Sequence, residues 1–165
     1  MGVVLIVAIV ILAVVAIAAL AFGPMLNKKG EAAVARCKEL LGAEEVRLIE
    51  PKANGFGTEP ATAGGLRGMG CLAMDDTDLV FVTWAPQKEF RLARSSITKV
   101  ATSADDLTGV QKAMVMVTYT DAGGSEVTAS WRLPDLVDWL TALGYDFGPD
   151  GPPAAPAAAD EDDDD

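Results

Sequence analysis

Hydrophobic and polar positions follow three different patterns along this chain. From Val3 to Phe22 every side chain is apolar, with no charge, amide or hydroxyl group. From Glu31 to Leu41 apolar residues return at a spacing of 3.6, which predicts a short helix. From Glu45 onwards the period changes to two, which predicts a series of strands. The chain therefore divides into an apolar run, a short helix and a mainly β domain.

The apolar run of residues 3–22 has the length of a membrane span. As a helix it measures roughly 30 Å, which is the thickness of the hydrocarbon core of a bilayer. Its surface is apolar on all sides, whereas a helix of a soluble domain has a polar face. We therefore expect a single-pass transmembrane helix, with the lipid bilayer as the partner of residues 3–22. The glycine and proline at positions 23 and 24 end the run.

The orientation of the predicted span follows from the charges beside it. Lys28 and Lys29 come directly after the span, and basic residues near a span favour the cytoplasmic side. We expect the C-terminal domain in the cytoplasm. The opposite orientation and a cleaved secretory signal stay open as alternatives. Residues 19–21 supply a small-x-small cleavage site, but no positively charged region precedes the apolar run.

The predicted helix from Glu31 to Leu41 has one apolar face and ends before Gly42. The residues of this face are Ala33, Val34, Cys37, Leu40 and Leu41. Charges of both signs lie opposite the face, which favours packing on the domain over packing on a membrane surface. The two cysteines, Cys37 and Cys71, fit buried apolar positions, although one disulfide stays possible in an oxidising compartment.

Short strands separated by turns make up the domain. We expect strands at residues 46–50, 66–74, 78–84, 88–92, 97–102, 113–120 and 126–132. Pro51 is expected to end the first strand, and the glycine-rich stretch that follows it is expected to be a loop.

The last predicted element is an amphipathic helix that follows Leu133 and ends before Gly144. Its apolar stripe consists of Leu133, Leu136, Val137, Leu140 and Leu143, with Trp139 beside it. The expected fold class is α+β (mainly β). In this class an N-terminal transmembrane helix precedes an antiparallel sheet or partial barrel, which the C-terminal amphipathic helix closes.

The sequence of the domain resembles the bacterial pleckstrin-homology-like and GRAM-like domains over about residues 45–145. The segments that carry the resemblance are GMGCLAMDDTDLVFV, KEFRLARSSITKV, DAGG and LPDLVDWLTAL. The matching positions are Gly70, Leu72, Leu79, Phe81, Leu92, Ile97, Val100 and Trp139. The chain departs from the family pattern at Asp75 and Asp76, which stand near the usual threonine. The resemblance implies a fold more than a function, because its motif is mainly hydrophobic spacing.

Charge and composition exclude several functions. Residues 28–149 hold all 13 Lys and Arg against 17 Asp and Glu, so the domain has a net charge of −4 and no basic excess for nucleic acid. The chain has no histidine, the commonest general base and zinc ligand. Ser95 and Ser96 lack a histidine to activate them, and the acids show no calcium-loop spacing. We therefore expect no enzyme activity, no cofactor and no metal site.

Five basic residues are candidates for binding an anionic ligand, because family members that bind phosphoinositides place Lys and Arg near the first hairpin. They are Lys52, Arg67, Lys88, Arg91 and Arg94. Acids interrupt the group in sequence, and a regular strand would place Lys88 and Arg91 on opposite faces. A solvated surface is the simpler interpretation of these residues.

The C-terminal tail is a Pro/Ala-rich spacer that ends in an acidic block. The acidic block is Asp160, Glu161, Asp162, Asp163, Asp164 and Asp165. Such a composition predicts disorder, with solubility as the simpler role and binding of a basic partner as the more specific one.

The expected layout has four parts. Residues 1–24 form the transmembrane helix, residues 25–44 a juxtamembrane linker with a short helix, residues 45–147 the domain and residues 148–165 the tail. The leading hypothesis is a non-catalytic, membrane-anchored module that recruits an unknown protein partner at the membrane surface. A lipid-headgroup-binding domain is the alternative, followed by a secreted domain behind a cleaved signal.

Overall fold

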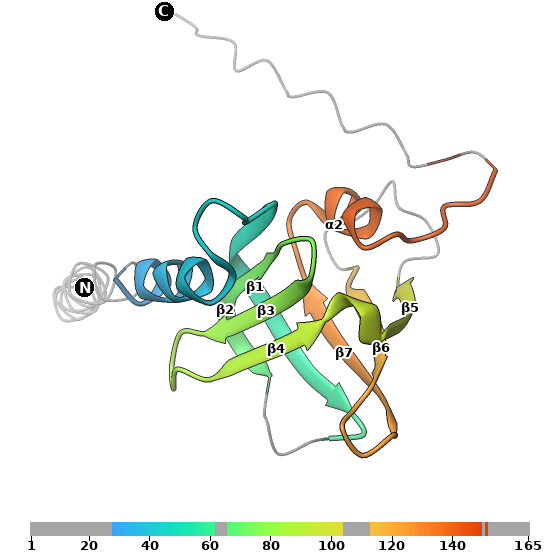
Figure 1. Ribbon diagram of the computed structural model, residues 1–165, viewed down its shortest axis with the longest axis horizontal. Coiled ribbons are helices and arrows are strands. Elements are labelled where there is room, and N and C mark those ends of the chain that lie inside the picture. The colour runs from blue at the N-terminus through green and yellow to red at the C-terminus, as the bar shows by residue number, and fades with distance from the viewer. Residues whose placement is uncertain (1–27, 62–65, 104–112, 150, 152–165) are drawn as a thin grey trace, which may run out of the picture.

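The computed structural model describes residues 28–61, 66–103, 113–149 and 151. In these ranges the chain forms one seven-stranded antiparallel sheet and two short helices. The first helix covers residues 28–41 and is called the N-terminal helix below. The second, α2, spans Leu136–Ala142. Figure 1 shows the N-terminal helix beside β1 and β2, and α2 at the opposite end of the sheet.

The strands run in chain order on each side of a central pair. They are β1 (Leu48–Glu59), β2 (Arg67–Met74), β3 (Asp78–Thr83), β4 (Glu89–Ala93), β5 (Ile97–Thr102), β6 (Val115–Thr120) and β7 (Glu126–Arg132). The order in the sheet is β4-β3-β2-β1-β7-β6-β5, so the first and last strands are neighbours. The edge strands β4 and β5 follow each other through a single 3-10 turn, η1 (Arg94–Ser96). The sheet must therefore curve strongly to bring these two strand ends together.

Aromatic side chains from both halves of the sheet meet inside this curve. Phe81 of β3 and Trp131 of β7 have ring centroids 6.0 Å apart, and Phe90 of β4 lies 5.8 Å from Tyr119 of β6. Phe81 and Trp131 are completely buried. Aromatic rings at these separations and tilts attract each other beyond the gain from their burial. The main core therefore lies on the inner face of the curved sheet.

A second apolar cluster lies on the outer face of β2 and β3. The N-terminal helix contributes Ala33, Cys37 and Leu41, and the strands contribute Cys71, Ala73, Val80 and Val82. This contact explains why β2 and β3 are apolar on both faces, since one face meets the core and the other meets the helix. The prediction that the apolar helix face packs on the domain is confirmed.

The expected fold class is wrong. The described chain is mostly one antiparallel seven-stranded sheet with two short helices, not a partial barrel closed by a C-terminal amphipathic helix. The apolar residues that predicted the closing helix lie partly before α2, partly within it and partly at its end. Leu133 lies before α2, Leu136 and Leu140 lie within its seven residues, and Leu143 caps its end. Apolar spacing alone did not separate a helix from the buried segments on either side.

The expected transmembrane helix is not part of the observed fold. Within the ranges given above, the structure holds no helix that is both long enough and apolar enough to cross a membrane. The predicted span at residues 3–22 lies outside the described residues.

The first strand also differs from the prediction. β1 continues through Pro51 and the following glycines to Glu59, where a loop was expected. Pro51 falls in a bulge, because the pairing with β2 shifts between Glu50 and Ala53. A proline in a bulge removes no hydrogen bond of the ladder. The other six strands match their predicted positions to within two residues.

Candidate binding groove

An open groove lies between the N-terminal helix and the sheet. It has a volume of about 470 Å³ and is mainly apolar. We call it the Trp84 groove; its lining residues are Gly30, Glu31, Val34, Ala35, Lys38, Pro51, Lys52 and Trp84. The helix forms one wall with a row of residues spaced by four, and the β1 bulge and the end of β3 form the other. A mainly apolar hollow with a few polar groups is the usual form of a binding site.

Trp84 is the largest side chain in the groove, and it is held firmly. Its backbone N–H donates to the carbonyl oxygen of Met69 over 2.9 Å, just beyond the last residue of β3. Gly30 lies against the indole, since a methyl group at Gly30 would lie 3.4 Å from a ring carbon. The indole N–H is buried and has no hydrogen-bond acceptor among the described residues. A buried donor without a partner carries a free-energy cost that an acceptor would remove.

Ion pairs fix the helix wall of the groove. Arg36 on the helix binds Glu89 of β4 with two hydrogen bonds, of 2.6 and 3.1 Å, and also pairs with Glu39 at 2.8 Å. The hydrogen bond from Arg36 lowers the pKa of the Glu89 carboxyl. Lys38 and Lys52, in contrast, line the groove and have no ion pair within the described ranges.

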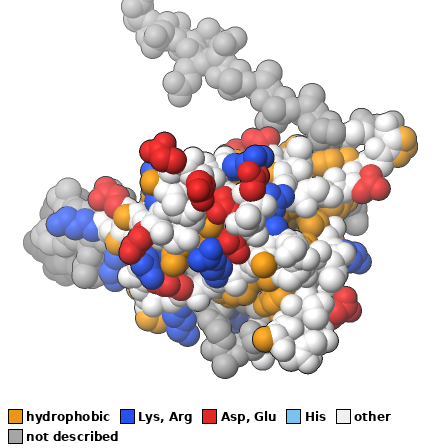
Figure 2. Space-filling view, viewed as in Figure 1, with side chains coloured by type: hydrophobic (Ala, Val, Ile, Leu, Met, Phe, Trp, Pro, Cys, Tyr) orange, Lys and Arg blue, Asp and Glu red, His pale blue; other side chains and the backbone are white. Residues whose placement is uncertain are grey.

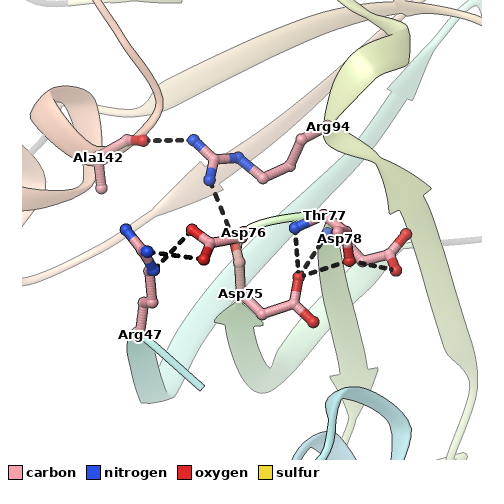
Figure 3. A network of polar contacts seen from close by, with 7 residues as sticks. All are labelled: Arg47, Asp75, Asp76, Thr77, Asp78, Arg94 and Ala142. Carbon is pink, nitrogen blue, oxygen red and sulfur yellow. Dashed lines mark hydrogen bonds and ion pairs between the residues drawn. The ribbon is translucent and has the colours of Figure 1, made fainter. Parts of the chain in front are cut away.

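Two of the five predicted anion-binding residues serve internal contacts. Arg91 pairs with Asp78 at 2.7 Å, and this carboxylate raises the pKa of Arg91. Arg94 donates to the carbonyl oxygens of Asp75 and Ala142, at 3.0 and 2.7 Å. Figure 3 shows the Arg94 side chain reaching from η1 between these two backbone segments. Both guanidinium groups therefore already have partners within the domain.

The remaining three predicted residues do not form a cluster. Lys52 lies in the Trp84 groove, and Arg67 lies at the start of β2, with its side chain over Gly57. The backbone of Lys88 closes the turn between β3 and β4 through Thr83. Basic and acidic side chains are interspersed on the face seen in Figure 2, without a single basic patch. Anion binding by the five residues stays a prediction, and only Lys52 lines the groove.

The acids at the β2–β3 turn stabilise the turn. Asp75 is 5% exposed, and its Oδ1 accepts hydrogen bonds from the backbone N–H groups of Thr77 and Asp78, each 2.6 Å long. Burial opposes ionisation of this carboxyl, but the hydrogen bonds from Asp78 and Thr77 outweigh it and lower its pKa. Figure 3 shows Asp75 turned toward these donors, while Asp76 faces Arg47. Asp75 therefore stabilises the turn through its carboxylate.

A second hollow, of about 560 Å³, lies at the corner between β4 and β5. Its lining includes Asp76, Arg94, Ser95 and Lys99. The guanidinium of Arg94 is already engaged there by two carbonyl oxygens. Among the described residues, no three His, Cys, Asp or Glu side chains are placed to hold a metal ion. The absence of an enzyme activity stays a prediction.

Sequence reasoning missed the groove, although one signal pointed to it. Trp84 ends an apolar strand and precedes Ala85-Pro86, so a large aromatic residue stands at a turn. The N-terminal helix, which lies beside Trp84, could not be placed there from spacing alone. The acidic block at residues 160–165 lies outside the described residues, and its binding role stays a prediction.

Comparisons with protein-family models, with curated proteins and with solved structures give no match. The resemblance to pleckstrin-homology-like and GRAM-like domains therefore stays a prediction from the sequence.

Proposed function

We propose that this chain is a non-catalytic interaction module, held at a membrane by residues 3–22, that binds a protein partner in the Trp84 groove. The observation that carries the proposal is the groove itself. It combines the indole of Trp84 with two lysines, Lys38 and Lys52, that have no ion pair among the described residues. Buried aromatic anchors of this kind provide much of the binding energy of protein interfaces.

The position of the groove in the chain supports a role at the membrane surface. Gly30, which lines the groove, lies eight residues after Phe22, the last residue of the apolar run. Only residues 23–27 separate the apolar run from the N-terminal helix, and five residues span at most roughly 17 Å. The helix is packed on the sheet, so it adds no slack to this connection. A partner in the groove would therefore be held close to the bilayer. We place the domain on the cytoplasmic side, because Lys28 and Lys29 follow the run.

The chemistry of the lining defines the partner. Val34, Pro51 and Trp84 offer apolar contact, and Lys38 and Lys52 offer positive charge. A segment with one large apolar side chain and a neighbouring carboxylate satisfies both features. We therefore propose an acidic, partly apolar segment of another protein as the ligand.

Crosslinking from membranes tests this function. The full chain is compared with a Lys38→Glu/Lys52→Glu variant, and captured proteins are quantified by mass spectrometry. We expect the charge reversal to reduce capture of the main partner at least roughly tenfold, because two favourable charges become repulsive. Lys99→Glu is the matched control, since it reverses an exposed lysine in the other hollow. Equal capture by all three proteins contradicts the proposal.

Two further experiments distinguish the groove's protein partner from a lipid headgroup and from binding by the acidic tail. The full chain is reconstituted in neutral membranes and mixed with anionic vesicles at low and high salt. Salt-sensitive vesicle binding that Lys38→Glu/Lys52→Glu abolishes would replace the protein partner with a lipid headgroup. A chain without residues 150–165 should keep its partner, since the groove lies in the described domain. Loss of the partner on this truncation would move the binding site to the acidic tail.

A further inference from the structure

The sequence contains two cysteines, and the fold brings them together. Cys37 lies on the N-terminal helix and Cys71 on β2, 34 residues apart in sequence. The Cys37 Sγ lies 3.5 Å from the carbonyl oxygen of Cys71 and donates to it. Both side chains are completely buried in the cluster that fixes the helix to the sheet. Both are free thiols in this structure.

The surroundings of the pair are apolar. Ala33 and Leu41 flank Cys37 on the helix, while Ala73, Val80 and Val82 belong to the sheet side of the same cluster. The neighbouring Cys37 thiol and burial both raise the pKa of the Cys71 thiol. An outside reagent reaches neither sulfur while the helix is docked. Because the sequence has two cysteines, each is the other's possible disulfide partner within one chain.

We propose that Cys37 and Cys71 form a disulfide that latches the N-terminal helix onto β2. Cytoplasmic thiols are normally kept reduced, so the bond forms under oxidising conditions. The oxidant is a small-molecule or protein disulfide, R–S–S–R. One cysteine thiolate attacks this bond, forms a mixed disulfide and releases the first R–S⁻. The second cysteine thiolate attacks the mixed disulfide, forms the Cys37–Cys71 bond and releases the second R–S⁻. The cysteines lose two electrons to R–S–S–R, and their two protons convert the released groups to R–SH.

The disulfide would hold one wall of the Trp84 groove in place. Gly30, Val34 and Lys38 belong to the helix that Cys37 would tie to the sheet. The burial of both sulfurs requires the first attack to occur while the helix is lifted, and the second bond then prevents it from lifting again. Oxidation therefore converts a helix held by packing and an exposed ion pair into one held covalently. The disulfide and its detection do not depend on a partner in the groove.

The covalent state of the full chain in detergent tests the latch directly. The protein is incubated with oxidised glutathione, and its intact mass is measured without reductant. We expect the loss of two hydrogen atoms, with no glutathione retained. Trypsin should then release residues 37–38 linked to residues 68–88, because cleavage sites flank both cysteines. Cys37→Ala and Cys71→Ala are the controls, and neither should form this linked peptide.

The effect of the disulfide on thermal stability gives a second measurement. A disulfide that closes a loop of this length should raise the melting temperature by roughly 10 °C, and a reducing agent should reverse the rise. The two alanine variants should show no response to the oxidant. The proposal is overturned if the wild-type chain keeps two free thiols, retains glutathione on either cysteine, or forms only disulfides between two chains.

Discussion

Arg94 donates a hydrogen bond from Nη2 to the carbonyl oxygen of Ala142, over 2.7 Å. The same guanidinium donates from Nη1 to the carbonyl oxygen of Asp75. One side chain in η1 thereby joins the last residue of α2 to the turn between β2 and β3. Without Arg94, both carbonyl oxygens would lose a charged donor at a partly buried site.

Replacing Arg94 with alanine should therefore destabilise the fold. A hydrogen bond to a charged group contributes about 1.5–3 kcal/mol, and we expect a loss within or slightly above this range. Urea unfolding followed by tryptophan fluorescence measures the loss. Arg91→Ala is the matched control, because it removes an arginine whose ion pair with Asp78 is exposed. If both variants lose equal stability, the contact with Ala142 has no special role.

Thr83 offers a second test of a buried polar contact. Its hydroxyl donates to the carbonyl oxygen of Pro86 and accepts from the backbone N–H of Lys88 at 2.8 Å. Thr83→Val keeps the shape but leaves both backbone groups without this partner, which should cost about 1–3 kcal/mol. Thr83→Ser keeps the hydroxyl and should retain most of the stability. Chemical denaturation of the two variants decides whether the hydroxyl or the methyl group matters.

Much of the sheet could be predicted from the sequence because its strands alternate in polarity. β6 and β7 bury every second residue, including Val115, Val117, Val127 and Ala129, which is the pattern of a half-buried strand. Turns at Asp75-Asp76 and Asp121-Gly124 also follow the expected chemistry, since Asp75 and Asp121 accept backbone N–H groups in each. These features are local, so one sequence suffices to find them.

The second half of β1 could not be predicted, because its stability comes from distant residues. A glycine-rich stretch has little to pack by itself. In the fold, the ring of Phe81 from β3 lies against Gly55 and Gly70, and the side chain of Arg67 lies over Gly57. The glycines are thus places where neighbouring side chains approach the backbone closely. Spacing along the chain carries no information about such contacts.

The candidate site was hidden for the same reason. Arg91 and Arg94 are exposed basic residues by sequence, but their partners lie 13 and 48 residues away. The Trp84 groove likewise needs three separate segments of the chain to meet. The apolar faces of these segments were visible in the sequence, whereas their contacts were not.

Gly70→Ala should disrupt the packing around Phe81. A methyl group at Gly70 would lie 2.5 Å from the carbonyl oxygen of Val82 and 2.6 Å from the Phe81 ring. The ring belongs to the aromatic core, and the carbonyl is part of the β2–β3 ladder, so neither can move freely. Overpacking of this kind costs about 1–3 kcal/mol. A melting temperature equal to that of the wild type would show that the backbone yields more easily than its hydrogen bonds imply.

Gly30→Ala, in contrast to Gly70→Ala, should increase the stability of the fold. A methyl group there would lie 3.4 Å from the Trp84 ring, which is an ordinary contact, and Gly30 lies in a helix. Replacing glycine with alanine inside a helix stabilises by roughly 0.5–1 kcal/mol. The same methyl group should shield part of the indole, so partner capture should fall while thermal stability rises. A variant that gains both stability and capture would contradict the assignment of Gly30 to the groove.

Asp75 should make the stability depend on pH in the acidic range. Its pKa is lowered in the folded state, because the hydrogen bonds from Asp78 and Thr77 to the carboxylate outweigh its burial. A carboxyl with a lowered folded pKa stabilises the fold fully above its unfolded pKa of about 3.9. This contribution is lost as the pH falls through the folded pKa.

Asp75→Asn isolates the contribution of the Asp75 charge. The amide oxygen can still accept the backbone N–H groups, but the side chain no longer titrates. The stability difference between the wild type and Asp75→Asn should be largest near neutral pH and should shrink below about pH 4. Urea unfolding at a series of pH values measures both proteins, with Asp76→Asn as a control at an exposed neighbour. A difference that stays constant from neutral to acidic pH would mean that the hydrogen bonds, and not the charge of Asp75, stabilise the turn.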